Sequence, residues 1–133
     1  MNSKVSKELA SHRLEQAKED LEAGKLLFEK SFYKSANNRA YYSIFHCIKA
    51  ILALEPIDFK SHKSVLAYFN KNYINTGIFP KTMGRKISNA STIREDSDYD
   101  DEFVVNENKT KEQLETAKEL INLVESYLIE KWN

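Results

Sequence analysis

Two stretches of the chain place an apolar residue or a glycine at alternating intervals of three and four positions. The first spans about residues 6–30, and its positions are Leu14, Ala17, Leu21, Gly24 and Phe28. The second spans about residues 107–131, and its positions are Leu114, Ala117, Ile121, Val124 and Leu128. These intervals bring the residues onto one stripe of an α-helix. Two long helices with matching narrow stripes are typical of antiparallel neighbours in a bundle.

The pattern predicts two more helices after the first. One covers about residues 33–54, is apolar over a wider arc and ends before Pro56, since proline disfavours helical geometry in the residue before it. This helix is expected to be central. Ser61 can cap a third helix that runs to about residue 73, and the Asn-Thr-Gly segment at residues 75–77 can close it.

A fourth helix is predicted to begin at Pro80, because proline suits the first turn, and to reach about residue 94. The acidic residues 95–102 are expected to form a turn or short loop. The chain contains only 3 glycines and 2 prolines, which argues against a fold with many short strands and turns. We therefore expect an all-α, up-and-down helical bundle of about five helices, forming a single domain over residues 1–133.

Charge narrows the choice of function. The 20 basic residues balance the 20 acidic ones, whereas a protein that coats nucleic acid is normally basic. Any contact with RNA must therefore come from a local patch or pocket. Cys47 is the only cysteine, and there is no secretory signal or apolar run long enough to span a bilayer. We expect a cytoplasmic protein without a membrane partner.

The helix predicted over residues 33–54 carries the main polar constellation. Arg39, Tyr42, Ser43 and His46 lie at offsets of zero, three, four and seven, so Arg39 and His46 share a face and are roughly 10 Å apart along the axis. Both side chains can converge on one phosphate group. There, a histidine can move a proton to or from a reacting oxygen and an arginine can stabilise the phosphate charge, without a metal. The alternative is a solvated polar face, which arginine and histidine often form on an amphipathic helix.

Other polar residues also have plain structural interpretations. His62 follows the predicted cap and suits an ordinary polar helix start. Cys47 lies in an apolar stretch, and the histidines lack zinc-ligand spacing. The acidic run after Arg94 partly matches a calcium loop, but Asp101 stands where such a loop needs glycine. We therefore expect no metal and no cofactor.

Three segments resemble the HEPN family of helical bundles. Residues 38–46, Asn-Arg-Ala-Tyr-Tyr-Ser-Ile-Phe-His, resemble the second-helix signature of small prokaryotic HEPN proteins. Residues 60–63, Lys-Ser-His-Lys, resemble the start of their third helix. Arg94, followed by Asp98 and Tyr99, resembles the end of their fourth. The segments occur in the family's order and cover nearly the whole chain.

The resemblance implies a homodimer and, in many members, a small nucleotidyltransferase antitoxin as partner. It also implies toxin-type, metal-independent ribonuclease activity from an arginine followed at a short interval by a histidine. Here the position five after Arg94 is Tyr99, and no histidine follows His62. Either Arg39 and His46 serve instead, or Arg94 and Tyr99 work with His46 or His62 brought near by packing, or cleavage has been lost.

Three hypotheses follow: a toxin-type ribonuclease, a non-catalytic module that binds a nucleotide, RNA or a protein partner, and a plain interaction bundle. Convergence of the key side chains in one cleft would favour the first two. The third gains if Arg39 only pairs with a carboxylate such as Asp98 and a backbone carbonyl holds His46. The candidate catalytic residues are Arg39, His46, Arg94 and Tyr99. The candidate binding residues are Tyr42, Ser43, His62 and Asp98.

Overall fold

The computed structural model describes residues 3–99 and 106–132, with the side chains of residues 4–96 and 106–132. It contains five α-helices and one short π-helical segment in this part of the chain. In chain order they are α1 (Ser3–Glu29), α2 (Tyr33–Leu52), α3 (His62–Phe69), η1 (Asn70–Ile74), α4 (Lys81–Tyr99) and α5 (Glu107–Trp132). No strand occurs in the described ranges. The all-α bundle predicted from the sequence is confirmed.

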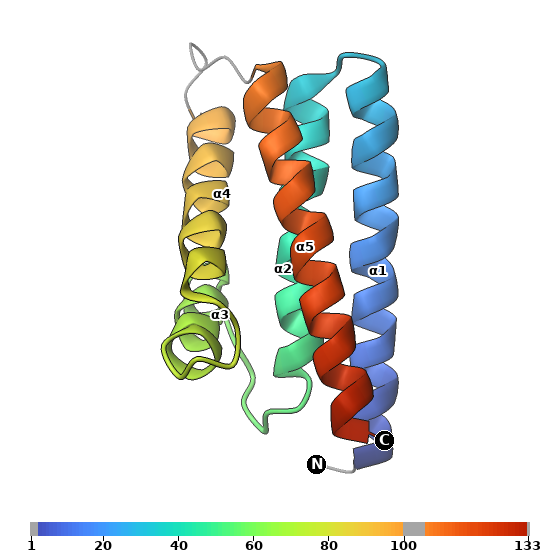
Figure 1. Cartoon of the computed structure of the whole chain (residues 1–133), viewed down its shortest axis with the longest axis vertical. Helices are drawn as coiled ribbons and strands as arrows, with labels where there is room; N and C mark the ends of the chain where they lie inside the picture. Colours follow the sequence, from blue (N-terminus) through green and yellow to red (C-terminus); the bar gives the residue numbers. More distant parts are fainter. Residues whose placement is uncertain (1–2, 100–105, 133) are drawn as a thin grey trace.

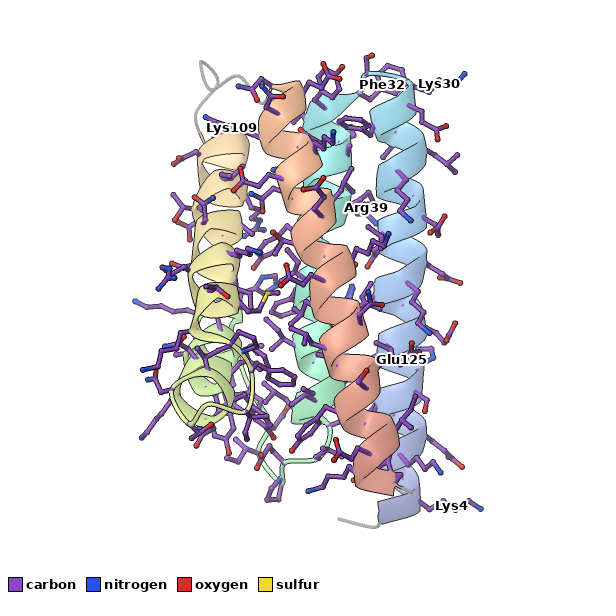
Figure 2. The ribbon with its side chains drawn as sticks, viewed as in Figure 1. Lys4, Lys30, Phe32, Arg39, Lys109 and Glu125 are labelled. Carbon is purple, nitrogen blue, oxygen red and sulfur yellow. The ribbon has the colours of Figure 1, made fainter. Side chains whose placement is uncertain are left out.

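The four long helices lie side by side and alternate in direction (Figure 1). In that view α1 runs upward, α2 downward, α4 upward and α5 downward. The short α3 lies low on the left, next to the start of α4. Both ends of the described chain are at the lower end of the bundle, and the α1–α2 turn is at the upper end, where Figure 2 labels Lys30 and Phe32.

Helix α2 is the centre of the bundle, because it packs against α1, α5, α3 and α4. Its Ile44, Ile48 and Ile51 are completely or almost completely buried. Gly24 lets α1 approach both α2 and α5, since a Cβ there would lie 2.9 Å from Leu114 Cδ2 and 3.3 Å from Arg39 Cβ. Within the described residues, no helix is long and apolar enough to cross a membrane.

The ends of α3 and of the turn after it follow the predicted chemistry. Ser61 caps α3 by accepting a hydrogen bond of 3.1 Å from the backbone N–H of Ser64. Gly77 takes a left-handed conformation, with φ of 84°, in the turn that precedes α4. Helix α4 then begins immediately after Pro80.

Two predicted boundaries were wrong. Helix α4 does not end at Arg94 but continues to Tyr99, so part of the acidic run is helical. The exposed carboxylates of Glu95 and Asp96 remain in water on the helix surface, so their unfavourable interaction with the C-terminal end of the helix dipole is small and does not end the helix. The third helix ends at Phe69, and its predicted last turn is the π-helical segment η1.

Candidate functional site

A narrow polar strip runs along α2. Between Arg39 and the end of the helix at Leu52, four side chains remain partly exposed while all the others are buried. They are Arg39, Tyr42, His46 and Lys49. Their spacing of three, four and three residues places them on one face. The strip is the part of α2 that the neighbouring helices leave open.

Asp20 of α1 borders this strip on one side. Its side chain is only 4% exposed, and its two carboxylate oxygens lie 2.7 Å from His46 Nδ1 and 3.3 Å from Arg39 Nη1. Figure 2 shows Arg39 on α2 next to α1. Asp20 therefore fixes the orientation of both side chains and leaves His46 Nε2 on the far side of the ring. Arg39 does pair with a carboxylate, that of Asp20, and the same carboxylate rather than a backbone carbonyl holds His46.

Sequence reasoning missed Asp20, although the sequence contained a signal. Asp20 lies three residues after Ala17 and four before Gly24, so it shares the apolar stripe of its helix. A carboxylate at such a position needs a polar partner on the facing helix, because a buried charge is costly unless it is paired. The partners are the two basic residues of the α2 strip.

We expect the Asp20→Ala substitution to lower the free energy of unfolding by about 1–3 kcal/mol, because Arg39 and His46 lose the group that holds them. Because Arg39 and His46 are partly exposed, water screens their interactions with Asp20 and limits the loss of stability. Urea unfolding followed by circular dichroism measures it. The matched control is Glu19→Ala, which changes an exposed neighbouring carboxylate and should shift stability by less than about 0.5 kcal/mol. Equal stability of the two variants would contradict the proposed role of Asp20.

Arg94 of α4 borders the strip on the other side. Its guanidinium carbon lies 5.2 Å from the Tyr41 ring centre and 5.9 Å from that of Tyr42. Its Nη2 donates a long hydrogen bond of 3.4 Å to the Tyr42 hydroxyl. The guanidinium of Arg39 lies 5.7 Å from the same Tyr42 ring. Tyr42 therefore has an arginine from α2 and one from α4 within cation–π distance.

His62, the first residue of α3, completes the cluster. Its ring stacks on Phe45 with 3.9 Å between ring centres, and its Nδ1 lies 3.0 Å from the Tyr41 hydroxyl. Burial lowers the pKa of His62, and the positive charges of Arg94, His46 and Lys49 lower it further. Three helices besides α1 thus contribute to one polar face.

The cluster is basic although the chain as a whole is neutral. Burial and the nearby Arg13 lower the pKa of Lys49, and the charge of Asp58 opposes that effect. Arg13 in turn donates a hydrogen bond of 2.8 Å to the Lys49 carbonyl. Lys49 and Arg13, together with Arg39 and Arg94, form a local cationic patch of the kind needed to contact the phosphate backbone of RNA. Among the described residues, no group of three or more histidine, cysteine or acidic side chains could hold a metal ion.

Ser43, another candidate, lies outside this cluster. Ser43 is completely buried, and its hydroxyl donates a hydrogen bond of 2.7 Å to the Ala17 carbonyl, so it joins α1 to α2 instead of facing a ligand. Cys47 is buried in the core, and burial raises the pKa of its thiol. Asp98 and Tyr99 belong to α4, but their side chains lie outside the described residues.

Comparison with known proteins identifies the family. The chain is 33% identical over 118 residues to a Methanocaldococcus jannaschii protein named "Putative toxin MJ0142", an alignment that covers 89% of this chain and 80% of the relative. It is 35% identical over 99 residues to "Putative toxin MJ0605" of the same organism, covering 74% and 73%. A Thermotoga maritima "UPF0332 protein" is 30% identical over 112 residues, covering 84% and 85%. The family model for the HEPN domain matches residues 10–127, and the chain therefore belongs to the HEPN domain family.

Proposed function

We propose that this protein is a toxin-type HEPN endoribonuclease that cleaves RNA without a metal ion. Two similar proteins bear the name "Putative toxin". The single observation that carries the proposal is the pair of His46 Nδ1 and Asp20 Oδ2, 2.7 Å apart, with Asp20 buried and His46 partly exposed. A histidine held by a carboxylate through one nitrogen presents the other nitrogen for proton transfer.

The chemistry needs only groups of this cluster and the RNA itself. The 2′-oxygen attacks the adjacent phosphorus and forms a new P–O bond while the P–O5′ bond breaks. One proton leaves the 2′-hydroxyl, and one proton joins the departing 5′-oxygen. His46 supports proton transfer, and the guanidinium groups of Arg94 and Arg39 stabilise the negative charge on the phosphate oxygens. The products are a 2′,3′-cyclic phosphate and a free 5′-hydroxyl.

A non-catalytic module that binds RNA or a nucleotide is the second candidate. The observation that favours it is the pairing of Arg39 Nη1 with Asp20 Oδ1 at 3.3 Å. Asp20 thereby neutralises part of the positive charge of Arg39, which a catalytic site would use to stabilise the phosphate. Such a module would retain the basic patch and bind phosphate without transferring a proton.

The deciding experiment incubates purified protein with end-labelled cellular RNA in EDTA. We expect discrete fragments with 2′,3′-cyclic phosphate ends. The matched control is the same RNA sequence with every 2′-hydroxyl methylated, which should remain intact because it has no nucleophile. Binding of both RNAs without cleavage of either would support the module instead, and cleavage of the methylated RNA would contradict the proposed mechanism.

A further inference from the structure

The cluster holds two imidazoles, and both lie against the same two aromatic rings. The ring centre of His46 is 6.1 Å from that of Tyr42, and the ring centre of His62 is 6.0 Å from it. Phe45 contacts both as well, at 6.1 Å from His46 and 3.9 Å from His62. Because His46 comes from α2 and His62 from α3, only the folded bundle brings these two titratable side chains together.

Cleavage of a phosphodiester by its own 2′-hydroxyl needs two proton transfers at opposite sides of the phosphorus. One group must accept the 2′-hydroxyl proton, and another must supply a proton to the 5′-oxygen as the P–O5′ bond breaks. One histidine cannot be in both protonation states at the moment of reaction. An active site with two separate imidazoles can satisfy both requirements in one step.

We propose that His62 is the second proton-transfer group, accepting the 2′-hydroxyl proton while His46 donates one to the 5′-oxygen. This inference rests on the ribonuclease function proposed above. The guanidinium carbons of Arg39 and Arg94 lie 5.7 and 5.9 Å from the centre of the Tyr42 ring, which both histidines also contact. Because all four side chains contact this one ring, a phosphate bound by the two guanidinium groups would lie near both imidazoles.

The surroundings of the two rings determine which histidine takes which role. His62 faces Arg94 from α4 and His46, Lys49, Tyr41 and Tyr42 from α2, and its pKa is lowered, so it is neutral near pH 7 and can accept a proton. When Nδ1 donates its proton to the Tyr41 oxygen, Nε2 carries the free lone pair. His46 instead has a carboxylate oxygen of Asp20 2.7 Å from its Nδ1, which fixes the ring and leaves Nε2 as the nitrogen that can reach a phosphate.

Two substrates separate the roles. One is a ribonucleoside 3′-phosphodiester with a second nucleoside as leaving group, and the other has 4-nitrophenol, which departs as a stable anion without receiving a proton. On the dinucleotide we expect His62→Gln and His46→Gln each to lower the cleavage rate in EDTA by about 10²–10⁴-fold. On the nitrophenyl ester, His46→Gln should regain most of the activity, whereas His62→Gln should remain defective because the 2′-hydroxyl still has to lose its proton.

Two further measurements distinguish proton transfer from packing. The wild-type rate should rise and then fall with pH, and His62→Gln should lose the rising limb, which reports the base. Added imidazole should partly restore activity to His62→Ala, and far-UV circular dichroism should show that both variants remain helical. The matched control is Lys63→Ala, which changes the next and exposed residue and should leave the pH profile unchanged.

The cleavage rates of the two glutamine variants distinguish failure of the His62 role from failure of the ribonuclease function. If wild type cleaves RNA and His46→Gln does not, but His62→Gln retains its rate and pH profile, the second-histidine proposal falls and the ribonuclease function remains. If His62→Gln regains activity on the nitrophenyl ester and His46→Gln does not, the roles assigned here are reversed and the proposal is wrong. If wild type cleaves neither substrate, the proposed function fails and this inference fails with it.

Discussion

Replacing His46 with glutamine should lower the rate of RNA cleavage in EDTA by about 10²–10⁴-fold, the range typical for loss of a general acid or base. Glutamine keeps a side-chain N–H for the buried Asp20 carboxylate but cannot exchange a proton near neutral pH. The defect should therefore be chemical, with little loss of fold. Single-turnover cleavage of labelled RNA measures it, because that experiment separates the chemical step from product release.

The chain offers a matched control in His12→Gln. His12 lies on α1 and is exposed, so the same substitution there should leave the cleavage rate within about twofold of wild type, as expected for a surface position. A second check is the affinity for the methylated RNA, which His46→Gln should retain because the arginines that bind phosphate remain. Unimpaired cleavage by His46→Gln would exclude His46 from the reaction and direct attention to the other titratable groups of the cluster.

The sequence predicted only part of the site, because the residues that contact one another there come from different helices. The offset of seven residues between Arg39 and His46 reveals that they share a face of α2, since that distance is set by the helix itself. Nothing in the local pattern says that Asp20 of α1 meets both, or that Arg94 of α4 lies over the Tyr41 and Tyr42 rings. Those contacts depend on how the helices pack, and the single sequence carries no direct record of packing.

The fold was easier to predict than the site, because the three-and-four spacing of apolar residues reports helices directly. The first and last helices, α1 and α5, follow from this spacing. The Ser61 cap and the turn at Gly77 follow from local chemistry. The end of α4 does not, because the expected loop rested on charge composition alone. Acidic residues in a row are compatible with a helix when their side chains reach water, so the run after Arg94 was a weak indication of a loop.

Replacing Phe69 with alanine should have the largest effect on stability, lowering the free energy of unfolding by about 3–5 kcal/mol. Phe69 is only 1% exposed, and its ring centre lies 5.5 Å from that of Tyr73 and 5.7 Å from that of Phe79. It is the last residue of α3, and its ring packs against side chains of η1 and of the turn before α4. Removing the ring leaves a cavity where these three segments meet, and the aromatic contacts are lost together with the buried area.

Urea unfolding of Phe69→Ala, followed by circular dichroism, tests this expectation against Phe32→Ala. Phe32 is 59% exposed at the α1–α2 turn, so its removal should change stability by less than about 0.5 kcal/mol. A loss below about 1 kcal/mol for Phe69→Ala would mean that the α3 region can collapse around the cavity. His62 begins the same helix, so such plasticity would also weaken the case that α3 holds that imidazole rigidly beside Phe45, as proton transfer at a fixed phosphate requires.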